Sequence, residues 1–136
     1  MNKNMYTLIF LVFSLTFSQG IQISYPQNSE NGVIIQYQST EDIYGFQFRV
    51  AGGELQNVSS TFDLISFSAS SGMVFGTSLS GESLPAGYGE LVQLEFIPIL
   101  DGYIISLEDI IIGGQLGATL PVSPFDDILI PPCANT

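Results

Sequence analysis

The chain has 136 residues, with two basic and 13 acidic side chains and a formal net charge of −11 at neutral pH. A surface of this charge repels phosphate backbones, so nucleic acid and anionic membranes are not expected partners. There is no histidine, which removes the commonest general base, and the single cysteine precludes an internal disulfide. Stability must therefore come from a hydrophobic core.

Residues 1–20 are expected to be a secretory signal peptide. Lys3 gives a short basic head, an apolar run covers residues 5–17, and small residues follow at Ser18 and Gly20. The apolar run is shorter than the roughly 20 residues needed to cross a bilayer, and a retained signal anchor is the alternative. The mature chain would be secreted, extracellular or at the cell surface, with no membrane span and with Arg49 as its only cation.

The remaining chain is expected to form one domain over residues 21–130, and its first half divides into short alternating segments. Residues 21–25 alternate and are predicted to end as a strand at Pro26, before a turn signalled by Asn28 to Gly32. Further strands are predicted at residues 33–38, 43–50, 54–60 and 64–69. In the segment at 43–50, alternate aromatic and apolar residues from Tyr44 to Val50 are expected to face the core.

The second half continues with predicted strands at residues 73–79, 91–96, 103–112, 120–122 and 128–130. A Pro/Gly-rich turn at residues 84–89 leads into the cleanest alternation, in which Val92, Leu94 and Phe96 point inward. The alternation in residues 103–112 slips around Glu108 and Asp109, which indicates a β-bulge.

Strand-like segments recur about every 8–12 residues with turn signals between them, a spacing typical of sandwiches and barrels. No segment after residue 20 has convincing helical periodicity. The predicted fold class is therefore all-β, a single antiparallel β-sandwich of about nine strands. Residues 131–136 are expected to be a C-terminal tail, where the Cys133 thiol would be free or paired with another chain.

The residues offer little for catalysis, and the protein is not expected to be an enzyme. A serine nucleophile needs a base, and no histidine or mature-chain lysine can supply one. Paired carboxylates are the surviving enzymatic idea. No cofactor or metal is expected, although the adjacent acids at positions 41–42, 108–109 and 126–127 leave a structural Ca²⁺ open as an alternative.

Polar side chains in the outward phase of the clearly alternating strands form the candidate binding face. If these strands share one sheet, the side chains give a flat, amide-rich patch around the only cation, although an ordinary solvated sheet face has the same pattern. The candidate residues are Gln36, Gln38, Gln47, Arg49, Gln93 and Glu95. Among the tyrosines, Tyr37 and Tyr44 are in phase with the core, and Tyr88 is the one most expected to be exposed. A single exposed ring is a poor platform for stacking on a sugar, which weakens the carbohydrate-binding interpretation.

Four motifs in order resemble cohesin-like domains. The first is Gly45-Phe46-Gln47-Phe48-Arg49-Val50, the second covers residues 72–79, and the third is a Gly-x-Leu-x-x-Leu-x-Phe pattern from Gly89 to Phe96 that follows Leu84-Pro85-Ala86-Gly87. The last is Ile105-Ser106-Leu107-x-x-Ile110-Ile111-Ile112 with Gly113 and Gly114 after it. The resemblance covers residues 33–122. Its motifs are hydrophobic patterns, and no contact residues match.

The resemblance implies an extracellular jelly-roll sandwich, related to carbohydrate-binding modules, that holds its partner on one flat sheet face. Cohesins bind dockerin modules in assemblies that degrade polysaccharides. The sequence therefore favours a secreted, non-enzymatic module that binds an extracellular, dockerin-like protein. The alternatives are a carbohydrate-binding module with a polysaccharide partner, and a structural protein that decorates a surface or particle. This chain is expected to depart from the family as a small, nearly stand-alone module with no dockerin or enzyme domain attached; the alternative is that it is an excerpt from a longer protein whose tail is a linker.

Overall fold

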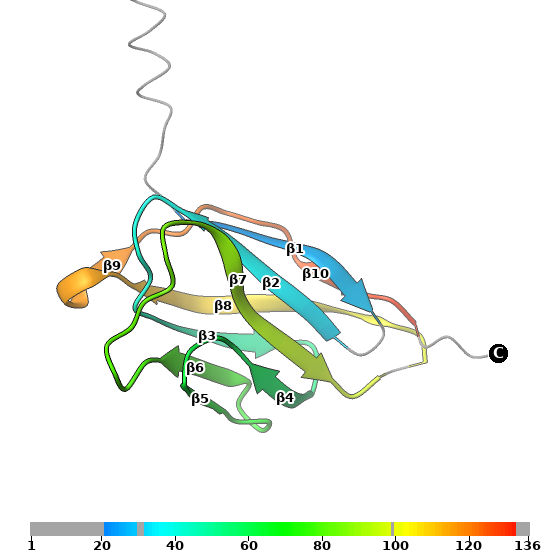
Figure 1. Ribbon diagram of the computed structural model, residues 1–136. Helices are drawn as coiled ribbons and strands as arrows, with labels where there is room; N and C mark the ends of the chain where they lie inside the picture. The colour runs from blue at the N-terminus through cyan, green and yellow to red at the C-terminus, as the bar shows by residue number, and fades with distance from the viewer. Residues whose placement is uncertain (1–20, 30–31, 99, 133–136) are drawn as a thin grey trace, which may run out of the picture.

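The computed structural model describes residues 21–29, 32–98 and 100–132, which form two β-sheets packed face to face (Figure 1). The expected signal peptide and Cys133 lie outside these residues. The described part contains ten strands, one 3₁₀ turn (η1, Gln115–Gly117) and no helix long and apolar enough to cross a membrane. The strands are β1 (Gln22–Ser29), β2 (Gly32–Ser39), β3 (Gly45–Ala51), β4 (Leu55–Ser59), β5 (Leu64–Phe67), β6 (Met73–Thr77), β7 (Gly87–Phe96), β8 (Tyr103–Gly113), β9 (Thr119–Leu120) and β10 (Ile128–Ile130).

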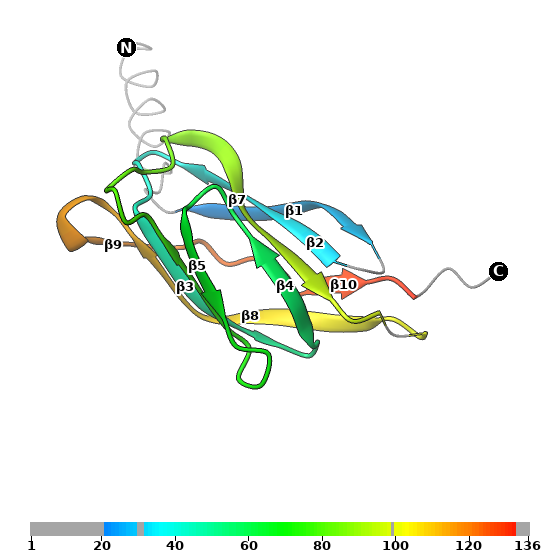
Figure 2. The same cartoon turned by 60° about the horizontal axis from the view of Figure 1, so that its bottom comes forward.

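The smaller sheet has the order β1-β2-β7-β4, and the larger sheet has the order β10-β8-β3-β6-β5, with β9 added to β8. All pairings between these strands are antiparallel. Figure 2 shows β4 beside β7 in the smaller sheet, with β8 in the other layer. The predicted all-β, antiparallel sandwich is confirmed.

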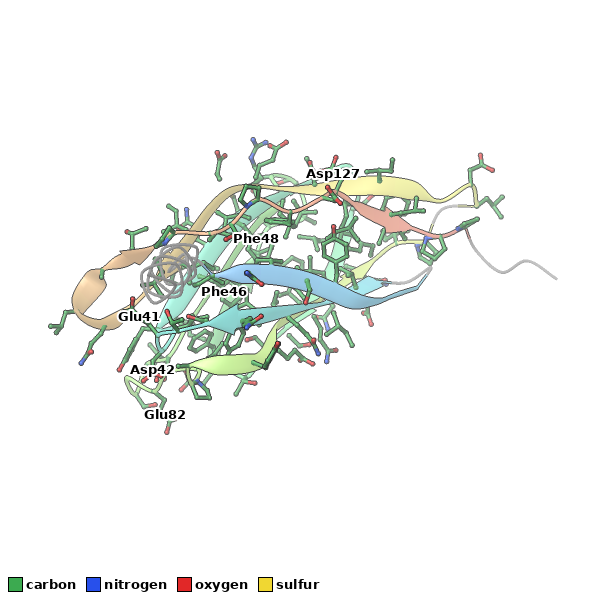
Figure 3. All side chains as sticks on the ribbon, turned by 90° about the horizontal axis from the view of Figure 1, so that it is seen from above. Glu41, Asp42, Phe46, Phe48, Glu82 and Asp127 are labelled. Carbon is green, nitrogen blue, oxygen red and sulfur yellow. The ribbon has the colours of Figure 1, made fainter. Side chains whose placement is uncertain are left out.

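The core lies between the layers because the strands alternate as predicted. In β3, Phe46, Phe48 and Val50 are buried, and the two rings stack with centroids 5.6 Å apart. Figure 3 shows both phenylalanines pointing between the sheets. Tyr37 and Phe96 fill the core from β2 and β7. Tyr44, expected inside, is half-buried because it lies one residue before β3 begins.

The predicted end of β1 and the predicted burial pattern of β7 need correction, and in both strands the pairing with β2 is irregular. Strand β1 does not end at Pro26 but continues to Ser29, with an irregularity in its pairing between Ser24 and Gln27. Proline is tolerated there because β1 is an edge strand and the irregularity removes the need for an amide donor. In β7 a similar irregularity lets Leu91 be buried together with Val92, which simple alternation does not predict.

The bulge predicted at Glu108 and Asp109 is confirmed. The pairing of β3 with β8 skips between Gln47 and Arg49, and Asp109 has a φ of 53°. This extra residue keeps Ile105 and Ile112 both in the core, although they are seven positions apart and simple alternation would place them on opposite faces. The bulge also brings two carboxylates next to Arg49, as described below.

Candidate binding faces

The six predicted face residues do not lie on one sheet. Gln36 and Gln38 on β2 and Gln93 and Glu95 on β7 belong to the smaller sheet, whereas Gln47 and Arg49 on β3 belong to the larger one. The single patch predicted from the sequence required all these strands to share one sheet, and they do not. Each sheet instead presents its own outer face, and the two faces differ in chemistry.

The outer face of the larger sheet carries a row of side chains that crosses four strands. Gln47 pairs directly with Phe75 of β6 and with Ile111 of β8, and Phe75 pairs in turn with Ser66 of β5. Phe75 is 41% exposed and Ile111 is 47% exposed. Because neighbouring strands lie about 4.8 Å apart, Phe75 and Ile111 are about 9–10 Å from each other, one on each side of the central amide. We name Phe75, Gln47 and Ile111 the apolar row.

An ion pair lies beside the apolar row on the same face. The Arg49 Nη2 atom is 2.5 Å from Oε1 of Glu108 and 3.6 Å from Oδ2 of Asp109. Both arginine and glutamate side chains are more than 40% exposed, so the pair adds little to stability. Its main effect is to hold the guanidinium beside the two carboxylates of β8.

Apart from the half-buried Ile34 of β2, the described side chains on the outer face of the smaller sheet are mostly polar. Cross-strand pairing places Gln22, Gln38 and Tyr88 in one row, and Ser24, Gln36 and Glu90 in the next. Further along β7, Gln93 donates to Glu90 at 3.0 Å, and Glu95 pairs with Asn57 of β4. Tyr88 is 77% exposed, as predicted. This face has amides, carboxylates and one aromatic ring, and no basic side chain.

Two further carboxylates hold loops in place. The Asp42 carboxylate accepts a hydrogen bond from the Ala86 amide at 2.8 Å, and Asp63 accepts one from the Leu79 amide at 3.0 Å. Figure 3 shows Glu41, Asp42 and Glu82 near one end of the sandwich, away from Asp127. Among the described residues, no group of three or more acids, histidines or cysteines has an arrangement that could hold a metal ion.

Two tyrosines have phenol groups whose pKa lies above the ordinary value. Burial raises the pKa of Tyr37, whose hydroxyl donates to the Pro85 carbonyl at 2.7 Å, and the Asp42 carboxylate raises it further. Burial also raises the pKa of Tyr25, with smaller contributions from Asp126 and Asp127. In both cases the folded state holds the phenolic proton more tightly than the unfolded chain does.

This shift predicts a loss of stability at alkaline pH. A raised folded-state pKa contributes stability fully below the unfolded value of about 10, and that contribution disappears as the pH rises through the folded value. Tyr37→Phe should therefore make the free energy of unfolding fall less steeply with pH above about 10. At pH 8 the same variant should lose about 0.5–1.5 kcal/mol with the hydrogen bond to Pro85.

Urea denaturation at a series of pH values measures both effects. Tyr88→Phe is the matched control at pH 8, because its hydroxyl is exposed and its removal should change the free energy by less than about 0.5 kcal/mol. A parent and a Tyr37→Phe variant with the same alkaline slope would contradict the prediction.

Reasoning from sequence found Gln47 and Arg49 but not Phe75 and Ile111. Phe75 stands between Val74 and Gly76, which are both buried, so its outward phase follows once Val74 is assigned to the core. Ile111 is outward only because the bulge at Asp109 resets the alternation of β8. The outward position of Phe75 could have been predicted from the alternation in its own strand. The outward position of Ile111 could be predicted only if the bulge was assigned to Asp109 itself.

The two-sheet arrangement is the fold of cohesin modules, as comparison with solved structures shows. A non-cellulosomal cohesin from the hyperthermophilic archaeon Archaeoglobus fulgidus matches with a TM-score of 0.58 and 13% identity, covering 76% of this chain and 85% of that one. The seventh ScaB type I cohesin from Pseudobacteroides cellulosolvens matches with a TM-score of 0.60 and 15% identity, covering 86% of this chain and 94% of that one.

A third similar structure is a type I cohesin–dockerin complex from Clostridium thermocellum, with a TM-score of 0.60, 9% identity and coverage of 77% of this chain and 88% of that one. No model of a known protein family matches the sequence, and no curated protein is similar to it. Identities this low show the fold alone. The resemblance to cohesin-like domains seen in the sequence is confirmed at the level of fold.

Proposed function

We propose that this chain is an exported, non-enzymatic module that binds an extracellular protein of the dockerin kind on the outer face of its larger sheet. The apolar row is the observation that carries the proposal. Exposed aromatic and aliphatic side chains on a flat, rigid surface are the usual anchors of a protein interface. Arg49 and Glu108 beside the row supply polar groups that can set the orientation of the partner.

The comparison with solved structures supports this choice. One similar structure is a cohesin in complex with a dockerin, and cohesin modules do not catalyse reactions. The described residues also hold no histidine and no assembled group of acids. Export is part of the proposal and rests on the pattern of residues 1–20.

A binding experiment with face-specific variants tests the proposal. The wild-type chain would be immobilised, proteins of the native extracellular medium would be passed over it, and the affinity of each retained protein would be measured by calorimetry. The double variant Phe75→Ser with Ile111→Ser should raise Kd by about 30-fold or more, as loss of central apolar anchors does. Arg49→Ala and Gln47→Ala should weaken binding by smaller factors.

The matched control removes exposed side chains from the other sheet. Tyr88→Ser with Gln93→Ala changes an aromatic ring and an amide on the smaller sheet and should leave Kd within about twofold. If instead the control abolishes binding and the variants of the apolar row do not, the larger sheet is not the binding face.

Carbohydrate binding by the smaller sheet is the second candidate function. The row formed by Gln22, Gln38 and Tyr88 supports it, because amides both donate and accept hydrogen bonds and an exposed ring can stack on a sugar. The absence of a basic side chain on this face restricts the ligand to neutral glycans. A glycan array in which neutral polysaccharides retain the wild type but not Gln38→Ala or Tyr88→Ala would favour this candidate.

A further inference from the structure

Strand β8 has a stretch of open edge between two short partners. On the side away from β3 it pairs with β10 at residues 103–105 and with β9 at Ile112 and Gly113. Within the described part of the chain, no strand pairs with residues 106–111 on that side. An unpaired edge exposes backbone groups that other structures cover with a strand, a loop or a partner.

The connection from β9 to β10 runs past this edge but is attached to the opposite sheet. The Ile21 amide donates to the Pro121 carbonyl at 2.7 Å, and the Ser123 amide donates to the Ile21 carbonyl at 2.8 Å. Nearer β10, the Tyr25 hydroxyl donates to the carbonyls of Asp126 and Asp127. Residues 121–127 are thus held by Ile21 at one end and by Tyr25 of β1 at the other, and a groove remains between them and β8.

The groove has a volume of about 450 Å³, which is within the range of about 300–1,000 Å³ that ligand-binding pockets occupy. Its apolar walls are Leu107 and Ile110 on one side and Val122 and Phe125 on the other. Asp109 and Asp127 contribute carboxylates to the same lining. An adjoining hollow of about 370 Å³ lies on the other side of Phe125 and includes Asp126.

The charge of the groove selects its occupant. Among the described residues Asp127 makes no ion pair, and Asp109 is 3.6 Å from Arg49, which makes a closer contact with Glu108. Arg49 is the only basic residue in the described part of the chain, so no other described side chain can supply a cation to Asp127. A group that fits must have an apolar stem and a positive end, and a cation beside Phe125 gains a further attraction from the ring.

We propose that this groove is a docking site for a lysine or arginine side chain from an extended basic segment of a partner protein. The methylene stem would pack against Leu107, Ile110 and Val122, and the charged end would lie between Asp109 and Asp127. The site is at the edge of the larger sheet and uses neither Phe75 nor Ile111 of the apolar row. It therefore goes beyond the function proposed above, and the two sites meet only where Asp109 contacts Arg49.

The test uses two synthetic heptapeptides that differ only in charge. Both are extended and otherwise uncharged; one has lysine at two alternate positions, and the other has norleucine there. Titration of the ¹⁵N-labelled full mature chain should show that the lysine peptide shifts the amide signals of residues 107–110, of residues 122 and 123, and of residues 125–127. The norleucine peptide should bind at least about fivefold more weakly.

Charge-removing variants of nearly unchanged shape complete the test. Asp109→Asn with Asp127→Asn should weaken lysine-peptide binding by about three- to tenfold, the effect of two partly exposed ion pairs. Asparagine tolerates the positive φ of Asp109, so the fold is preserved. Asp101→Asn, an exposed acid outside the groove, is the matched control and should leave binding unchanged. Equal binding of both peptides, an unaffected double variant or shifts confined to other regions would overturn the proposal.

Discussion

Phe96→Ala should lower the free energy of unfolding by about 3–5 kcal/mol, the usual cost of emptying a phenylalanine site in a core. Phe96 is completely buried at the end of β7 and meets the Tyr103 ring edge-on, with centroids 6.1 Å apart. It pairs with Leu55 of β4, so its ring helps to hold an edge strand on the smaller sheet. With no disulfide available, packing is the main source of stability, and such a loss is a large share of the total.

Phe75→Ala is the matched control, because it removes the same side chain from an exposed position. Its ring is 41% exposed on the outer face, so the variant should cost less than about 1.5 kcal/mol. Urea denaturation of both variants gives the comparison. Similar losses would show that Phe75 supports the fold, and variants at this position would then be unsuitable for the binding experiment.

The strands could be predicted from the sequence because each carries its own evidence. The alternation of Phe46, Gln47 and Phe48 predicts which side chains point inward, and this prediction does not depend on which strand is the neighbour. The bulge at Asp109 was visible for the same reason, since it breaks a pattern within one strand. Local pattern therefore gave the fold class and most of the core.

The partition of the strands between two sheets could not be read in the same way. Strands β2 and β3 are neighbours in the chain, yet the connection between them crosses from one sheet to the other. Gln38 and Gln47 have the same outward phase on either arrangement, because alternation says nothing about which strand is the partner. Only the pairing of β2 with β7 and of β3 with β6 and β8 separates the two faces.

Gly72→Ala should cost about 2–4 kcal/mol, more than the conformation of the residue alone explains. Gly72 has a φ of 80°, and a Cβ atom there would lie 2.2 Å from the Val50 carbonyl oxygen. Its own carbonyl accepts a hydrogen bond from the Val50 amide at 2.8 Å. The substitution must therefore push β3 away from the turn between β5 and β6, beside Arg49 and the apolar row.

Gly81→Ala separates the two causes. Gly81 has a φ of 82°, nearly the same backbone conformation, and a Cβ atom there would have no neighbour within 4 Å. Gly81→Ala should lower the free energy of unfolding by only about 1–2 kcal/mol, the cost of a left-handed backbone conformation for a non-glycine residue. The difference between the two variants in urea denaturation measures the close approach of Gly72 to β3. Equal losses would mean that the turn relaxes freely, and β3 would then be less firmly held against the turn than its contacts indicate.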